Sequence, residues 1–347
     1  MNIALVCPYD LGLPGGVQDQ VVKLSGWLRD LGNETLILGP GTEGPDGAVL
    51  LGSARIVKAN AASTPISFNP RMRARIVEAV AGVDVVHIHE PLMPTVSLSA
   101  ARITDLPTVG TFHADPPRWA RASYSALSPI VSRVLTHLDI ITTVSPVSLS
   151  AVVHLGDVRV IPNGIDLERY SGPDKVHGRV VFLGRDDPRK GLDTLVEAWE
   201  IVRRRCPAAT LHVVGADRKI TIPGITFLGR VTEAVKQQEL AKAEVFVAPN
   251  LGGESFGIVV AEGMAAGAAV VASGIPAFLH VLGGAGEIVA PGDAAGLGDR
   301  IADVLRDDER RGTLSKASKE RVRRFSSHVV ADRYLKAYAD AIAHHRT

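Results

Sequence analysis

The chain has 347 residues, of which 46% are hydrophobic, and its formal net charge is +1. This length suits two domains of ordinary size, each with its own core. The balanced charge provides no bulk attraction to polyanions, so we expect no nucleic-acid partner. No apolar run is long enough to span a bilayer, and the N-terminus lacks the basic region of a signal peptide. We therefore expect a cytoplasmic protein, or one peripheral on the inner face of the plasma membrane.

The first residues predict a buried strand over residues 3–7, followed by a glycine-containing loop and a helix that ends before Gly32. The loop carries Gly15 and Gly16 where a phosphate could approach the backbone. Its spacing is not that of a dinucleotide-binding loop, and no Walker lysine follows. An ATP or dinucleotide site therefore loses support, and a plain tight turn remains an alternative for Gly15.

Further apolar runs predict strands over residues 34–39, 84–88, 108–112 and 158–161, whereas residues 52–70 have no assignable pattern. Between them, residues 71–80 read as an amphipathic helix. Its three arginines, Arg71, Arg73 and Arg75, could meet anionic lipid at about 1 kcal/mol each. A solvated helix face is the plainer alternative, and any contact with an anionic membrane would be local.

Histidines follow two of these strands. His87 and His89 alternate along one strand and share a face, but no third ligand is evident, so we expect no metal site. His113 comes directly after the strand over residues 108–112. A polar residue at the carboxyl end of a parallel strand faces the ligand crevice, which favours a site role for His113 over a core role.

A second group of strands begins at residue 179, after a polar linker. The strand over residues 179–183 runs into a loop with Arg185 and Lys190, and a helix follows over residues 192–205. Arginine offers a planar fork and lysine a compact charge, so the two together could clamp a diphosphate. Each alone is more often a surface cation.

The most informative stretch follows the predicted strand over residues 245–248. Gly252 and Gly253 permit a tight turn, and the amides of residues 255–258 fall at a helix N-terminus, where an anion is favoured. Glu254 and Glu262 are eight residues apart, a little over two helical turns. We expect Glu262 to point inward, where a carboxylate can accept hydrogen bonds from vicinal hydroxyls, as on a ribose. The alternative is that each glutamate is simply a solvated side chain near a helix cap. That alternative explains neither the glycine pair nor the small residues of the helix that follows.

This stretch resembles the donor-binding motif (glutamate, seven residues, glutamate) of retaining family 4 glycosyltransferases. The resemblance implies the GT-B fold, an α/β architecture with two Rossmann-like parallel-sheet domains that face a cleft. Residues 1–165 would form the acceptor-binding domain and residues 166–325 the nucleotide-sugar donor-binding domain. A helix in residues 326–347 would cross back onto the first domain.

The resemblance also implies site residues. His113 would contact the transferred sugar, and Arg185, Lys190 and Glu254 would complete the catalytic set. The donor would be bound by Gly16, Arg185, Arg189, Lys190, Val231, Thr232, Glu233, Lys236, Glu254, Ser255, Phe256, Gly257, Ile258 and Glu262. The cationic side chains would take the role of a metal, so no cofactor is required, and no protein ligands are predicted for a Mg²⁺ ion that could accompany the diphosphate.

Segments of the first half resemble the phosphatidylinositol mannosyltransferases of actinobacteria: residues 7–9, 14–18, 87–91 and 111–113. This implies transfer of mannose from GDP-mannose to an inositol phospholipid with retention, with Tyr9, Gln18 and Asn60 in the acceptor site. The chain has Pro65 where that family carries a phosphate-binding arginine, and Ala114-Asp115 where it carries Thr-Ser.

Other functions therefore remain open. One alternative is a family 4 transferase with a UDP- or ADP-sugar donor, or with a soluble acceptor such as an inositol or sugar phosphate. Others are a nucleotide-sugar epimerase of the GT-B fold, which needs no acceptor, and a non-catalytic nucleotide-binding module.

Overall fold

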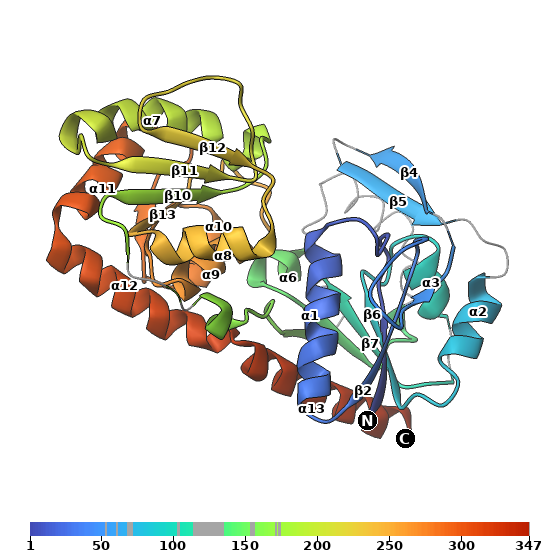
Figure 1. The fold of residues 1–347 in the computed structure, drawn as a ribbon. Helices are drawn as coiled ribbons and strands as arrows, with labels where there is room; N and C mark the ends of the chain where they lie inside the picture. Colours follow the sequence, from blue (N-terminus) through green and yellow to red (C-terminus); the bar gives the residue numbers. More distant parts are fainter. Residues whose placement is uncertain are drawn as a thin grey trace. The chain divides into compact units, whose positions relative to one another are not determined.

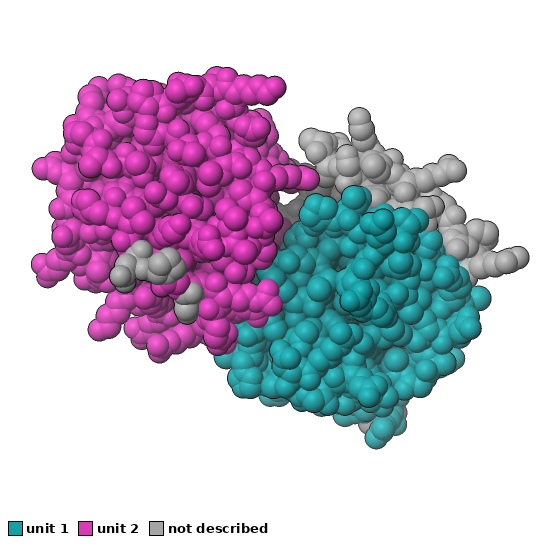
Figure 2. Space-filling view, viewed as in Figure 1, with its two compact units in different colours: residues 1–164, 327–347 teal, residues 165–326 magenta. Residues whose placement is uncertain are grey.

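In this computed structural model, residues 1–52, 54–59, 62–67, 72–102, 105–113, 135–152, 157–170, 172 and 175–346 are described. The chain forms two compact units, coloured separately in Figure 2. Unit 1 contains residues 1–164 and 327–347, and unit 2 contains residues 165–326.

Seven of the described strands of unit 1 form a parallel sheet in the order β3-β2-β1-β6-β7-β8-β9. Their bounds are β1 (Asn2–Val6), β2 (Glu34–Gly39), β3 (Val49–Leu50), β6 (Val85–His89), β7 (Thr108–Phe112), β8 (Ile140–Thr143) and β9 (Val158–Val160). The described helices of this unit are α1 (Gly16–Asp30), α2 (Met72–Ala79), α3 (Val96–Ala100), α6 (Pro146–Val152) and α13 (Ser327–His345). Helices α1 and α13 pack on one face of this sheet, and α2 and α3 on the other (Figure 1).

A two-stranded antiparallel hairpin, β4 (Ala54–Ala59) and β5 (Ala62–Ser67), lies in the segment that the sequence left unassigned. The sequence had no clean alternation there, because Lys, Ser, Thr and Pro interrupt its apolar residues. Helix α13 is the last helix expected from the sequence, and its residues 330, 334 and 338 are buried against the sheet of unit 1.

Unit 2 repeats the architecture with six parallel strands in the order β12-β11-β10-β13-β14-β15. The strands are β10 (Arg179–Leu183), β11 (Thr210–Val214), β12 (Ile225–Gly229), β13 (Val245–Ala248), β14 (Ala269–Ser273) and β15 (Glu287–Val289). The α-helices are α7 (Leu192–Arg205), α8 (Glu233–Lys242), α9 (Ile258–Ala265), α10 (Pro276–Leu282), α11 (Ala294–Arg306) and α12 (Asp308–Val322). Short 3₁₀ turns are η2 (Leu167–Tyr170), η3 (Pro188–Lys190) and η4 (Arg323–Phe325).

The central strands of both sheets are apolar runs because parallel sheets are covered by helices on both faces. All residues of β13 and β14 are buried, and β10 and β11 contribute to a core closed by α7 and α11. The expected α/β fold with two Rossmann-like parallel sheets is confirmed.

Candidate functional site

The strand order of unit 2 defines its ligand crevice. Strand β10 lies beside β13, and the connections leave these two strands toward opposite edges of the sheet. Ligands of open parallel sheets bind outside the carboxyl ends of the strands at such a switch point. The loops that follow β10 and β13 are the two that carry the predicted cations and Glu254. The amide of Leu251 donates to the carbonyl of Arg189 at 2.8 Å, which joins the two loops.

Lys190 and Glu254 form an ion pair between these loops. The Nδ2 of Asn250 also donates to Oε1 of Glu254, at 2.8 Å. Both side chains of the pair are largely buried, with 20% and 17% exposure. The structure therefore brings together two of the predicted catalytic residues and holds the ammonium group in a fixed place.

The other two cations of the first loop are more open. The guanidinium of Arg189 donates two hydrogen bonds to the Asp187 carboxylate, from Nε to Oδ1 at 3.2 Å and from Nη2 to Oδ2 at 2.7 Å. Hydrogen bonding from Arg189 lowers the pKa of the Asp187 carboxyl to about 2. The carbonyl of Arg185 accepts from the Asp187 amide at 2.9 Å, whereas its side chain is exposed and has no hydrogen bond or ion pair with a described side chain. The loop thus presents one unpaired guanidinium and two cations balanced by carboxylates.

Helix α9 begins after Gly257, whose φ of +99° is a left-handed conformation. A Cβ at this glycine would lie 2.8 Å from the Phe278 ring, so the position requires glycine. No side chain caps the helix N-terminus. The backbone amides near Ile258 therefore remain suited to an anion. The Phe256 side chain is buried against Phe325, with ring centroids 5.4 Å apart, so it packs in the core of unit 2.

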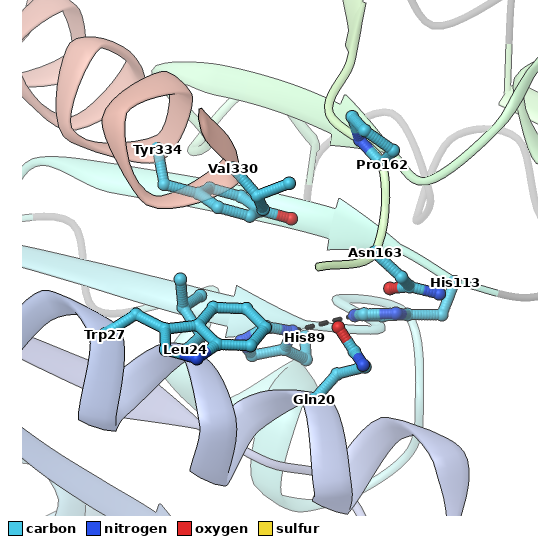
Figure 3. Close-up of a pocket in the computed structure, with 9 residues that line it drawn as sticks. All are labelled: Gln20, Leu24, Trp27, His89, His113, Pro162, Asn163, Val330 and Tyr334. Atoms are coloured by element: carbon cyan, nitrogen blue, oxygen red, sulfur yellow. Dashed lines mark hydrogen bonds between the residues drawn. The ribbon is translucent and has the colours of Figure 1, made fainter. Parts of the chain in front are cut away.

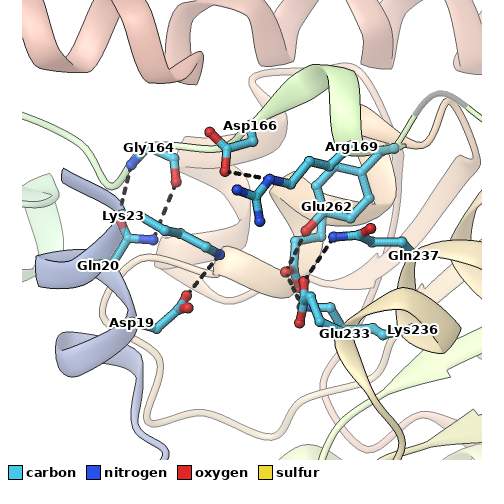
Figure 4. A network of polar contacts seen from close by, with 11 residues as sticks. Asp19, Gln20, Lys23, Gly164, Asp166, Arg169, Glu233, Lys236, Gln237 and Glu262 are labelled. Atoms are coloured by element: carbon cyan, nitrogen blue, oxygen red, sulfur yellow. Dashed lines mark hydrogen bonds and ion pairs between the residues drawn. The ribbon is translucent and has the colours of Figure 1, made fainter. Parts of the chain in front are cut away.

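Glu262 lies inside unit 2 and is 3% exposed. Its Oε1 accepts a hydrogen bond from Nζ of Lys236 at 2.7 Å (Figure 4). The hydroxyl of Tyr170 donates to the same oxygen, also at 2.7 Å. Lys236 also contacts Glu233 at 2.8 Å. Burial opposes the positive charge of Lys236, but the two carboxylates overcome that cost and raise its pKa. No described residue bonds to Oε2 of Glu262, which leaves an acceptor in a largely enclosed site.

The first turn of α8 carries the cation that contacts this carboxylate. Thr232 is the N-cap residue, and its hydroxyl accepts from the amide of Val235 at 3.4 Å. This cap sets the direction of the helix that carries Glu233 and Lys236. Val231 precedes the cap and is half-buried, while Ser255 lies in the loop before α9. Gly16 belongs to unit 1.

In unit 1 the switch point lies between β1 and β6. The loop after β1 contains Tyr9, and the first turn of α1 contains Gly16 and Gln18. The Gln18 amide donates to the carbonyl of Asp10 at 3.2 Å, which closes this loop on itself. Tyr9 is partly buried against the core of unit 1. Asn60 and the Ala114-Asp115 pair lie outside the described residues.

His113 follows β7 and is 8% exposed. Its Nε2 lies 2.8 Å from Nδ1 of His89, and its backbone amide donates to Oε1 of Glu90 at 2.7 Å. Burial lowers the pKa of His113 to about 4, although a hydrogen bond with the Asn163 side chain opposes the shift. His113 is therefore neutral at physiological pH. Among the described residues, no cluster of His, Cys, Asp or Glu is arranged to hold a metal ion.

A small cavity of about 10 Å³ lies beside His113 within unit 1 (Figure 3). Its walls come from α1, the ends of β6 and β7, the segment after β9, and α13. The lining residues are Gln20, Leu24, Trp27, His89, His113, Pro162, Asn163, Val330 and Tyr334.

Two of the arginines proposed for lipid contact, Arg73 and Arg75, lie on α2. Arg73 is exposed. The guanidinium of Arg75 donates to the carbonyl of Leu50 at 2.8 Å, so part of its hydrogen-bonding capacity is used within the protein. Arg71 lies outside the described residues. In the described part of the chain, none of the helices has the length and hydropathy needed to cross a membrane.

Sequence reasoning missed three residues that shape these sites. Tyr170 lies 92 residues before Glu262, and no local pattern connects them. The sequence pattern around His89 suggested only a possible metal ligand. Asn163 is 8% exposed and lines the cavity beside His113, and the only signal for it was the Pro-Asn-Gly turn after β9.

Comparisons with known proteins agree with this organisation. A family model described as Glycosyltransferase Family 4 matches residues 14–169, and one described as Glycosyl transferases group 1 matches residues 177–307. The phosphatidyl-myo-inositol mannosyltransferase of Mycolicibacterium smegmatis is 35% identical, and the alignment covers 97% of this chain and 93% of that protein. The phosphatidyl-myo-inositol mannosyltransferase of Propionibacterium freudenreichii is 34% identical, and the alignment covers 81% of this chain and 79% of that protein. Sucrose-phosphate synthase from Thermosynechococcus elongatus shares the fold, with a TM-score of 0.73 at 22% identity and 99% coverage of both chains.

Proposed function

Because this chain belongs to glycosyltransferase family 4, and is thus a glycosyltransferase, we propose that it transfers mannose from GDP-mannose to the inositol ring of phosphatidylinositol, with retention of configuration. The observation that carries the proposal is the likeness to phosphatidyl-myo-inositol mannosyltransferases over nearly the whole chain. The two glutamates support the donor part, since Glu254 pairs with Lys190 at the switch point of unit 2, and Glu262 is buried in α9 beside Lys236.

In this proposal the donor binds to unit 2. The buried Glu262 accepts the ribose hydroxyls through its open oxygen, and the first turn of α8 contacts the base. The diphosphate lies near Arg185, Lys190 and the N-terminus of α9. Negative charge grows on the departing diphosphate as the glycosidic bond breaks, and fixed cations and amides stabilise it. The proposal requires no metal ligand from the protein.

The sugar and the acceptor would meet near His113 in unit 1. A neutral histidine can donate one hydrogen bond to a hydroxyl of the transferred sugar. In the described part of unit 1, no pair of carboxylates of the kind used by retaining hydrolases stands out on the acceptor side. We therefore propose attack on the face that the diphosphate leaves, with the leaving phosphate accepting the proton of the inositol hydroxyl. The enzyme would act on the cytoplasmic face of the plasma membrane, where its lipid acceptor lies.

A soluble acceptor is the second candidate. Pro65 and Ala114-Asp115 replace residues that, by resemblance, contact the lipid phosphate, and an acidic group beside an anionic acceptor repels it. An inositol phosphate or a sugar phosphate would then replace the lipid.

Calorimetry followed by a transfer assay tests both candidates. The protein is titrated with GDP, UDP and ADP, and then incubated with GDP-mannose and vesicles of phosphatidylcholine with or without phosphatidylinositol. We expect the tightest binding for GDP and mannolipid only with phosphatidylinositol. A preference for UDP or ADP would overturn the donor assignment. Transfer to inositol phosphate without vesicles would establish the soluble acceptor instead.

A further inference from the structure

Two histidines from neighbouring strands contact each other directly at the proposed sugar end of unit 1. His89 is the last residue of β6 and pairs in register with Thr111 of β7, two residues before His113. This register brings Nδ1 of His89 within 2.8 Å of Nε2 of His113 (Figure 3). His89 is 1% exposed.

Packing holds the His89 ring in one orientation. It lies on the ring of His87, with centroids 4.1 Å apart. His87 is itself fixed at both nitrogens, by the hydroxyl of Tyr338 at 2.8 Å and that of Thr111 at 2.6 Å. The carbonyl of His89 accepts from Ser97 at 2.7 Å. The contact with His113 is therefore built into the interior of unit 1.

Each of the two rings carries one proton, because burial lowers the pKa of both histidines. Only one proton lies between the facing nitrogens. In the first arrangement His89 carries it on Nδ1 and His113 accepts it at Nε2, so the proton of His113 is on Nδ1. In the second arrangement His113 donates from Nε2, and the proton of His89 is on its own Nε2.

The surroundings of the second His89 nitrogen decide between these arrangements. Nε2 of His89 is buried and has no hydrogen-bond partner among the described residues. Apolar side chains, including Leu24, Trp27 and Val330, form much of the cavity that His89 lines, and its volume of about 10 Å³ is at the lower limit for one water. Buried N–H groups without an acceptor are rare in proteins, whereas under-satisfied acceptors are less so. The first arrangement leaves only an acceptor unsatisfied.

We propose that His89 is a positioning residue that donates from Nδ1 to Nε2 of His113 and thereby keeps His113 in its Nδ1–H form. His113 then has a single donor, Nδ1–H, which the neighbouring Asn163 side chain can accept in the free protein and a hydroxyl of the transferred sugar would accept in the complex. The catalytic consequence rests on the proposed function, whereas the position of the proton is a property of the free protein.

Three substitutions of His89 separate this role from simple packing. In His89→Asn the side-chain amide occupies the place of Nδ1 and can still donate to His113. In His89→Gln the amide lies nearer the place of Nε2 and cannot, and His89→Leu removes all hydrogen bonding while keeping an apolar side chain. Thermal unfolding of each variant establishes that it is folded.

The first readout is the tautomer of His113, observed by long-range ¹H–¹⁵N correlation spectra of the free, ¹⁵N-labelled protein. Its signals are assigned by their loss in His113→Gln. We expect a proton on Nδ1 of His113 in the wild-type protein and in His89→Asn, and a mixture of forms in His89→Leu. A wild-type proton on Nε2 of His113 would overturn the proposal.

The second readout is transfer of mannose from GDP-mannose to phosphatidylinositol vesicles. We expect His89→Asn to keep most of the wild-type kcat, and His89→Gln and His89→Leu to lose up to about 100-fold in kcat with an unchanged KM for the donor, as for a misplaced reacting group. Equal activity of all three folded variants would refute the positioning role. If the wild-type protein transfers no mannose, the proposed function fails, but the spectra still determine whether His89 sets the tautomer.

Discussion

The hydroxyl of Tyr170 donates to Oε1 of Glu262 at 2.7 Å, across 92 residues of sequence. This bond links the 3₁₀ turn η2 at the start of unit 2 with the helix α9 that carries the glutamate. Lys236 donates to the same oxygen, so Oε1 of Glu262 accepts two hydrogen bonds within the protein. The carboxylate thus has a fixed orientation before any nucleotide arrives.

Replacement of Tyr170 by phenylalanine removes one of these donors from a buried charge. We expect the free energy of unfolding of unit 2 to fall by about 1.5–3 kcal/mol, the range for hydrogen bonds to charged groups. Urea unfolding of Tyr170→Phe, Glu262→Gln and the double variant forms a cycle that isolates the coupling between them. Losses that simply add in the double variant would show that the two residues do not interact.

Replacement of Glu262 by glutamine tests whether its open oxygen binds a ribose. We expect about a 10-fold or greater loss in GDP affinity, because hydrogen bonds to a charged acceptor are lost. The wild-type protein should bind GDP more tightly than 2′-deoxy-GDP, and Glu262→Gln should lose that preference. Calorimetry with both nucleotides measures it, and a preference that survives in the variant would place the ribose elsewhere.

Replacement of Lys190 by alanine tests the diphosphate clamp. The variant loses a held cation and leaves Glu254 without its ion-pair partner, so we expect GDP to bind about 10- to 100-fold more weakly. Binding of guanosine, which has no phosphate, should change little. Lys316→Ala, an exposed lysine of α12, is the matched control and should bind GDP normally. Equal losses for GDP and guanosine would mean that Lys190 supports the fold instead.

Gly191 occupies a place where a side chain has no room. Its φ is +69°, and a Cβ would lie 2.0 Å from the carbonyl oxygen of Pro249 in the neighbouring loop. We expect Gly191→Ala to separate the two loops, to lower the thermal midpoint of unfolding by several degrees and to abolish GDP binding. Gly312→Ala in α12, where a Cβ meets nothing within 4 Å, should instead stabilise the protein slightly. A normal midpoint for Gly191→Ala would contradict the steric argument.

The buried histidines predict a loss of stability in acid. Burial, with a smaller contribution from His113, lowers the pKa of His87 from 6.5 to about 3. Between these values the unfolded chain binds the proton and the folded protein does not, so stability falls as pH drops below about 6.5. His87 alone would account for a loss on the order of 2 kcal/mol at pH 5. Urea unfolding from pH 7 to 5 should show a shallower dependence in His87→Gln, and an unchanged dependence would assign the acid sensitivity to other groups.

The sequence predicted the regular parts of the fold because buried parallel strands are short apolar runs. The strands β2, β7, β10 and β13 have the bounds that the sequence predicted, and each is built largely from apolar residues. The hairpin β4–β5 could not be predicted in this way, since its pairing joins two segments whose own patterns are irregular.

The site could be predicted only where its residues are close in sequence. The spacing of Glu254 and Glu262 and the cations after β10 indicated a donor site from local patterns. The network around His113 could not be predicted, because His87, Thr111 and Tyr338 meet only through strand order and through the last helix. Ion pairs such as Arg189 with Asp187 depend on rotamers that a sequence does not specify.

Unit 1 is built from two separate segments of the chain, which has a consequence for biosynthesis. Residues 165–326 are contiguous, so unit 2 can fold as soon as they have left the ribosome. Unit 1 lacks α13 until residues 327–347 emerge, and until then the apolar face covered by Val330, Tyr334 and Tyr338 stays open to water. The domain whose residues are translated first is thus the last to be completed, and nascent chains stalled before α13 would expose a surface that chaperones bind.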